Sequence, residues 1–194
     1  MKAQTILIGL AGPAGCGKDT VRGFLEHRHQ FAGIALADPM RVMLRELLIT
    51  NGCDDAYLTK RDLKEVEIPG LGVSARLMMQ TLGHEWARKH LAEDFWLRLA
   101  ATKIAALHGQ GFPRVVVSDI RYANEAAWVR YQGGEVWQID RPGLAPVRSH
   151  PSECIHFRVD QVLRNDGTLA QLERATLDSL VSLKRFSCFG REAV

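Results

Sequence analysis

The stretch Gly9-Leu-Ala-Gly-Pro-Ala-Gly-Cys-Gly-Lys-Asp-Thr20 directly follows the apolar run Thr5-Ile-Leu-Ile8. This order predicts a buried strand, then a glycine-rich loop, then a helix that opens at Lys18. Residues 12–18 match the spacing G-x-x-x-x-G-K of a phosphate-binding loop, with Asp19 where a hydroxyl residue is usual and Thr20 one place later. The pattern therefore predicts a binding site for a nucleoside triphosphate.

The residue types of this loop suit a phosphate. Its glycines can adopt backbone angles closed to other residues, so successive N–H groups can curl around an anion. The N-terminal end of the following helix adds positive potential, and Lys18 is expected to reach the β- and γ-phosphates. The residues expected to contact the triphosphate are Gly12, Ala14, Gly15, Cys16, Gly17, Lys18, Asp19 and Thr20.

Asp19 stands where the usual loop has the hydroxyl group that binds Mg²⁺. A carboxylate can hold this ion directly or through water, because Mg²⁺ favours hard oxygen ligands, and Thr20 would then contact the α-phosphate. A favourable interaction with the helix dipole, about 0.3–1 kcal/mol, also explains an aspartate here, and the sequence leaves both interpretations open. The expected metal ligands are Asp19, Thr20 and Asp119.

Length and composition limit the class of protein. A chain of 194 residues suits one α/β domain, and the net charge of +3 suits an anionic small molecule but is too weak to argue for a nucleic-acid polymer. The four cysteines are scattered without metal-site spacing, which predicts a reducing, cytoplasmic setting. We expect no signal peptide and no membrane span, because no apolar run approaches the required length.

Alternating strands and helices predict an α/β fold, a three-layer sandwich of the P-loop NTPase type around a mostly parallel sheet. Strands are expected over residues 4–10, 33–36, 115–119, 135–140 and 159–163, and helices over 18–27, 38–48, 74–90, 94–108 and 124–131 and after residue 168. Residues 1–194 are expected to form one domain, with a mobile, irregular segment at 50–73 and a lid-like loop at 141–153. Ligands of such sheets bind at the carboxyl ends of the strands.

Three helix starts are expected. Asp38 precedes Pro39 and reads as an N-cap, Ser74 caps the next helix, and Thr168 with Gln171 forms a capping box.

The helix over residues 74–90 is expected to have two different faces. At 100° per residue, one face carries Met78, Met79, Leu82 and Trp86, which suits either the core or a homodimer interface. The opposite face carries Arg76, Gln80, Gly83 and Ala87, and is expected to form a shallow groove for a base or phosphate, or else an ordinary solvated surface.

Phosphoryl transfer needs cations around the transferred group, and the expected sheet edge is rich in them. Asp119 ends an apolar strand, where a P-loop enzyme places the acidic residue that organises magnesium, and Arg121 follows at the same edge. Glu125 either orients Arg121 or a substrate group, or acts as a first-turn acid at a helix start. His150 either closes over the ligand or lies in a solvated loop, and Arg41 either meets a second substrate's phosphate or is exposed.

An ordered set of motifs is similar to those of the phage-type deoxynucleoside monophosphate kinases, a branch of the P-loop nucleoside monophosphate kinases. The motifs are Gly15-Cys-Gly-Lys-Asp-Thr20, Arg76-Leu-Met-Met-Gln-Thr-Leu-Gly83, Val117-Ser-Asp-Ile-Arg121 with Glu125, Arg141-Pro-Gly143, His150-Pro-Ser-Glu153 and Asn165-Asp-Gly-Thr-Leu169. The resemblance implies transfer of the γ-phosphoryl group of ATP to a deoxynucleoside monophosphate, with Mg²⁺ as cofactor.

The resemblance also implies roles for individual residues. It places the ATP phosphates on the loop from Gly12 to Thr20, and the closing region on residues 141–153. The implied catalytic residues are Lys18, Arg76, Asp119 and Arg121. The implied acceptor-binding residues are Arg41, Arg76, Gln80, Arg121, Glu125 and His150.

Two other functions fit the loop. One is a kinase for another small phosphorylated acceptor, such as dephospho-coenzyme A or phosphomevalonate. The other is a regulator that binds ATP without transferring phosphate. The number of arginines favours a kinase, since a binding switch needs fewer cations near the γ-phosphate. The sequence leaves the accepted base open.

Overall fold

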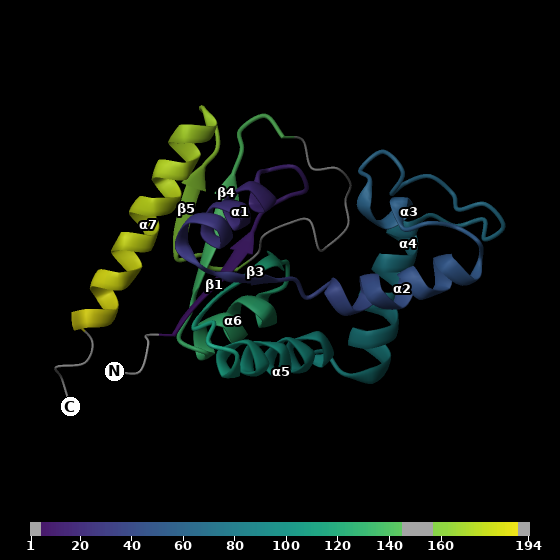
Figure 1. The fold of residues 1–194 in the computed structure, drawn as a ribbon, viewed down its shortest axis with the longest axis horizontal. Coiled ribbons are helices and arrows are strands. Elements are labelled where there is room, and N and C mark those ends of the chain that lie inside the picture. The colour runs from purple at the N-terminus through teal and green to yellow at the C-terminus, as the bar shows by residue number, and fades with distance from the viewer. Residues whose placement is uncertain (1–4, 145–156, 190–194) are drawn as a thin grey trace. The chain divides into compact units, whose positions relative to one another are not determined.

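The computed structural model describes residues 5–144 and 157–189, and their side chains up to residue 183. The chain divides into two compact units, one made of Met1–Ile34 and Lys103–Val194 and the other of Ala35–Thr102. Figure 1 labels the helices and strands of both units along the chain.

The first unit is built on a five-stranded sheet in which every neighbouring pair is parallel, which confirms the predicted α/β class. In spatial order the strands are β2 (Ala32–Ile34), β3 (Arg114–Ile120), β1 (Ile6–Ala11), β4 (Glu135–Asp140) and β5 (Gln161–Arg164). Its helices are α1 (Lys18–His29), α6 (Ala123–Tyr131), α7 (Leu169–Phe189) and the second half of α5 (Phe95–Gly109).

Helices cover both faces of this sheet, so the predicted three layers are present. On one face, buried side chains of the strands pack with Val21 and Leu25 of α1 and with Leu172 and Leu180 of α7. Gly9 lies on the other face, where a Cβ would come within 3.2 Å of Val129 on α6. The start of α7 has the predicted capping box, because Thr168 N–H donates to Gln171 (2.7 Å) and Gln171 N–H donates to the Thr168 hydroxyl (3.3 Å).

Strand β3 contains a β-bulge that the sequence pattern did not predict. Gly9 pairs with Val117, but Ala11 pairs with Ile120, so β3 has one extra residue between these pairs. The extra residue falls at Ser118 and Asp119, and Ile120 consequently packs against the same face as Gly9. A bulge changes the direction of side chains near the end of a strand, and here it takes Asp119 out of the strict alternation.

The second unit is mostly helical. Its elements are α2 (Asp38–Thr50), α3 (Ala56–Thr59), α4 (Ala75–Gln80), η1 (Thr81–Leu91) and the first half of α5. Leu58 and Ile68 are buried here together with Leu44 and Leu48 of α2. The segment 50–73 is irregular outside the short helix α3, as expected, but Leu58 and Ile68 make it part of this core. Its mobility stays a prediction.

Helix starts in this unit match the expectations in part. Ser74 is the N-cap of α4, and its hydroxyl accepts from Leu77 N–H at 3.3 Å. Asp38 is not the N-cap of α2, because the helix begins at Asp38 itself and Ala37 holds the cap position. The Asp38 carboxylate instead accepts from Ala35 N–H at 2.7 Å, so it stabilises the turn that precedes the helix.

The prediction that Gly83 and Ala87 line an open groove with Arg76 and Gln80 is wrong, because the helix changes its winding after Gln80. From Thr81 to Leu91 the chain forms a π-helix, which has more residues per turn than the 100° spacing assumes. Ala87 is fully buried, and a Cβ at Gly83 would lie 3.0 Å from the Met40 sulfur. Trp86 is 39% exposed and meets Phe95 edge to face, with ring centroids 5.8 Å apart.

Each helix among residues 5–144 and 157–189 is too short or too polar to span a membrane.

Candidate functional site

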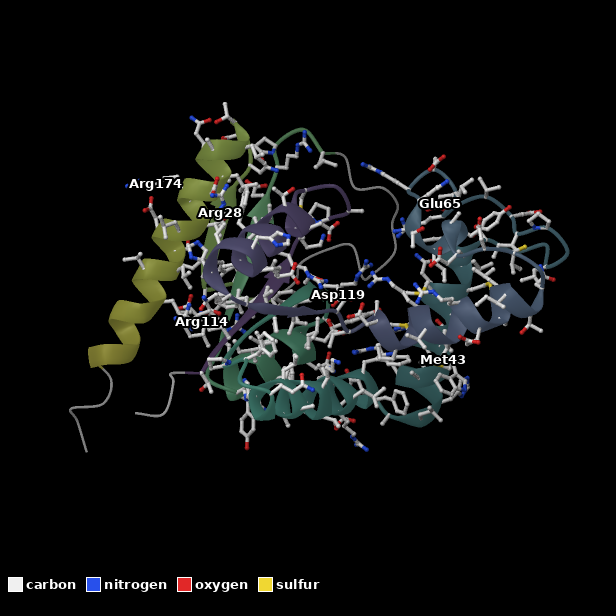
Figure 2. The ribbon with its side chains drawn as sticks, viewed as in Figure 1. Arg28, Met43, Glu65, Arg114, Asp119 and Arg174 are labelled. Atoms are coloured by element: carbon white, nitrogen blue, oxygen red, sulfur yellow. The ribbon has the colours of Figure 1, made fainter. Side chains whose placement is uncertain are left out.

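The carboxyl ends of four adjacent strands in the first unit bring the predicted loop and its neighbours to one edge of the sheet. The loop follows β1, the central strand, whose last residue Ala11 pairs with Ile120 of β3 and with Gln138 of β4. Asp119 and Arg121 lie at the end of β3 (Figure 2 labels Asp119), and Asn165 directly follows β5. This edge is where parallel α/β sheets bind their ligands.

The backbone of the loop has the conformation that its glycines predict. Gly12, Gly15 and Gly17 have φ angles of 143°, 81° and 110°, in the region that favours glycine. A Cβ at Gly12 would lie 2.6 Å from Cys16 Sγ and 2.7 Å from the Ile139 carbonyl oxygen. The loop therefore requires glycine here for space as well as for its φ angle.

Lys18 and Cys16 hold the loop closed on itself. The Lys18 ammonium donates to the carbonyl oxygens of Gly12 (2.6 Å) and Pro13 (2.8 Å). Cys16 is fully buried in the core of the unit. Burial raises the pKa of the Cys16 thiol, and the Lys18 ammonium nearby offsets only part of this rise. Cys16 is therefore a protonated packing group at neutral pH, and thiolate chemistry at this position is disfavoured.

Glu125 organises the turn that follows β3. Its buried carboxylate accepts from the backbone N–H groups of Arg121 (2.8 Å) and Tyr122 (3.1 Å), at the start of α6. This is the arrangement of a first-turn acid that satisfies free backbone donors of a helix. Because the bond uses the backbone of Arg121, it fixes where the Arg121 side chain begins.

The donor set at this edge fits a magnesium ion. Asp19 is exposed in the first turn of α1, Thr20 follows it, and Asp119 is half-buried at the end of β3. Over residues 5–144 and 157–189, no group of three or more His, Cys, Asp and Glu side chains forms a metal cage. Magnesium in nucleotide sites uses one or two carboxylates together with substrate phosphates, and these oxygen donors are of that chemical kind.

The second unit carries the other predicted site residues, Arg41, Arg76 and Gln80. Glu65 binds the Arg76 guanidinium on one edge, with Glu65 Oε1 2.9 Å from Nε (Figure 2 labels Glu65). The Arg76 backbone N–H also donates to the Lys64 carbonyl at 2.9 Å. The neighbouring residues Lys64 and Glu65 therefore hold both the backbone and the guanidinium of Arg76. Arg41 pairs with Asp38 at 2.8 Å, and Gln80 is half-buried at the end of α4.

Part of the predicted closing region is described. Arg141 follows β4, and its guanidinium donates to the Gly15 carbonyl at 3.3 Å, which places it at the loop. His150 and the rest of residues 145–153 lie outside the described residues.

Asn165 also lies at this edge, and no function was predicted for it from the sequence. Its side-chain amide donates to the Cys16 carbonyl at 2.8 Å, across 149 positions of sequence. The sequence signals were its place, directly after the last strand and before the capping box of α7, and the motif Asn165-Asp-Gly-Thr-Leu169 that it opens.

The chain is similar to known proteins over most of its length. The family model described as deoxynucleotide monophosphate kinase matches residues 70–176. A protein of Acanthamoeba polyphaga mimivirus, provisionally named deoxynucleotide monophosphate kinase, is 31% identical over 86% of this chain and 91% of its own length. The deoxynucleotide monophosphate kinase of Enterobacteria phage T4 is 30% identical over 51% of this chain and 42% of its own length.

Among solved structures, a dephospho-CoA kinase from Campylobacter jejuni aligns with 94% of this chain and 98% of its own. Its TM-score of 0.48 and its identity of 13% are too low for any shared detail to be inferred.

The loop geometry leads to a prediction about Gly12. We expect Gly12→Ala to destabilise the protein more than Gly111→Ala, a position with a φ of 89° and no atom within 4 Å of the added Cβ. Both variants have left-handed strain of about 1–2 kcal/mol, and only Gly12→Ala adds overpacking of about 1–3 kcal/mol. Urea unfolding of the two variants measures the difference, and equal losses would contradict the described loop.

Proposed function

The chain belongs to the deoxynucleotide monophosphate kinase family, and we propose that it transfers the γ-phosphoryl group of ATP to a deoxynucleoside monophosphate. The products are ADP and a deoxynucleoside diphosphate. The observation that carries the proposal is the phosphate loop with Lys18, placed after the central strand of a parallel sheet. The reducing, cytoplasmic setting predicted from the cysteines suits such an enzyme of nucleotide supply.

On the donor side, the loop backbone and Lys18 would bind the ATP phosphates. The Lys18 ammonium donates to the carbonyl oxygens of Gly12 and Pro13. Binding of ATP exchanges these neutral acceptors for charged phosphate oxygens, which form stronger hydrogen bonds with an ammonium group. These two hydrogen bonds hold Lys18 at the loop, so it would need little reorganisation to bind a phosphate.

Asp19, Thr20 and Asp119 would hold the magnesium ion of the nucleotide. A bound Mg²⁺ neutralises charge on the β- and γ-phosphates as it develops during transfer. In this arrangement Asp119 benefits from the bulge in β3, which frees its side chain from the alternation of the sheet.

On the acceptor side, Arg76 and Arg121 are the arginines that we expect to matter most. The Glu65 carboxylate binds Arg76 through Nε. A guanidinium held at Nε keeps the edge formed by its two terminal nitrogens for a second, bidentate partner, and a phosphate suits that geometry. We propose that Arg76 binds the acceptor phosphate in this way, with Arg41, Gln80 and His150 as further acceptor contacts.

Arg121 would neutralise charge on the transferred group. The two backbone N–H groups that donate to Glu125 fix the turn that carries Arg121, so its side chain starts from a defined place. Glu125 would act by positioning Arg121.

A product assay tests the proposed function. The protein is incubated with Mg-ATP and dGMP, dTMP, dCMP, dAMP or their ribonucleotides, and ADP and diphosphate products are counted separately. We expect equal amounts of ADP and one deoxynucleoside diphosphate. ADP without a diphosphate, or no reaction, would instead favour another phosphorylated acceptor or an ATP-binding regulator.

Lys18→Met is expected to abolish turnover and leave the fold intact. The variant removes the charge that would reach the β- and γ-phosphates, and the thioether chain keeps most of the packing volume. Initial rates of product formation measure the effect, and circular dichroism checks the fold. A near-normal rate would remove Lys18 from the donor site.

Arg76→Ala and Arg121→Ala are each expected to lower kcat/KM for the acceptor by about 10- to 100-fold, since hydrogen bonds to charged groups contribute about 1.5–3 kcal/mol. The KM for ATP should change less. Arg121→Ala keeps the backbone donor that binds Glu125, so the turn should persist.

The matched controls are Arg45→Ala in the second unit and Arg174→Ala in the first. Both remove an exposed arginine that pairs with an aspartate, at 3.0 Å and 3.3 Å. They should leave the kinetics of both substrates unchanged. If Arg76→Ala or Arg121→Ala raised the KM for ATP alone, that residue would belong to the donor side.

A further inference from the structure

Asn165 is fixed by its backbone at the edge of the sheet beside the phosphate loop. Its N–H donates to the Asp140 carbonyl at 2.7 Å, just beyond the last pair of the β4–β5 ladder, Asp140 with Arg164. Gly167 and the capping box of α7 follow within three residues and end the turn. The position of the Asn165 side chain is therefore set by the sheet and by the helix that follows.

The Asn165 side-chain amide contacts the loop at the Cys16 carbonyl oxygen. Nδ2 donates to the Cys16 carbonyl oxygen at 2.8 Å. The Cys16 side chain is fully buried, so this residue is held by its thiol in the core and by its carbonyl at Asn165. With both groups held, the peptide between Cys16 and Gly17 has little freedom to rotate.

The orientation of this peptide decides where the Gly17 N–H points. In a trans peptide the carbonyl and the following N–H point in opposite directions. When the Cys16 carbonyl is turned to Asn165, the Gly17 N–H is turned away from Asn165. In a loop that curls its N–H groups around an anion, a rotated peptide would present a carbonyl oxygen to the phosphate.

Gly17 also leaves space for the Asn165 side chain. A Cβ there would lie 2.6 Å from Asn165 Nδ2, and the φ angle of Gly17 is 110°. A side chain at position 17 would therefore have to displace the Asn165 amide, in addition to adopting the positive φ that the loop needs.

We propose that Asn165 is a positioning residue for ATP, which holds the Cys16–Gly17 peptide so that the Gly17 N–H donates to a phosphate oxygen. The proposal rests on the proposed function only in that ATP is the loop's ligand. It assigns to Asn165 an effect on the donor nucleotide and none on the acceptor.

The test is a calorimetric titration of the full chain with a non-hydrolysable ATP analogue and Mg²⁺, in the absence of an acceptor. For Asn165→Ala we expect the Kd to rise about five- to tenfold, the size of one lost hydrogen bond. Asn165→Asp has the same shape but replaces the donor by an oxygen that repels the Cys16 carbonyl, so we expect a larger rise. The KM for the acceptor should stay unchanged in both.

Gln171→Ala is the matched control for a merely structural role. It breaks the capping box that Gln171 forms with Thr168, and should lower the Tm without changing the Kd for the analogue. If Asn165→Ala lowered the Tm and left the Kd unchanged, or if Asn165→Asp bound as tightly as the wild type, the proposal would be overturned. Should the alanine variant fail to fold, the isosteric aspartate variant decides.

The experiment separates this proposal from the proposed function. A wild-type chain that binds the analogue but phosphorylates no deoxynucleoside monophosphate would contradict the function and leave the Asn165 comparison decisive. A wild-type chain that binds no analogue would overturn both.

Discussion

The left-handed backbone between Gly12 and Gly17 is the constraint on which the rest of the site depends. Three positive φ angles within six positions reverse the chain between the central strand and α1, and at Gly12 the Ile139 carbonyl leaves no room for a Cβ. The buried Cys16 side chain ties this turn to the core, so the loop cannot move as a free surface segment. The ends of β3, β4 and β5 then supply the groups that surround it.

The sequence was sufficient where the signal is local. The strand, loop and helix around Lys18 follow from residue types and spacing, and the predicted capping box of Thr168 and Gln171 has both of its bonds. The parallel sheet follows from the alternation of strands and helices, since that order gives parallel neighbours. In these places the propensity of each segment agrees with its tertiary role, as natural sequences commonly require.

The sequence was insufficient where the determinant is a contact between distant segments. The bulge in β3 depends on how Gly9 and Ala11 pair with another strand, and the bond from Asn165 reaches Cys16 over 149 positions. A hydrogen-bond partner that far away leaves no trace in local periodicity. The winding of η1 was missed for a related reason, because the 100° assumption is itself a choice of helix type.

The wide winding of η1 has a consequence for changes in chain length. A π-helix holds about one more residue per turn than an α-helix, through hydrogen bonds from residue i+5 to residue i, as in the bond from Ala92 to Ala87 at 2.9 Å. Deleting one residue between Thr81 and Leu91 can therefore be absorbed by rewinding one turn as α-helix, with no broken loop. Single-residue insertions and deletions in this segment would alter which side chains face the buried side while the helix itself persists.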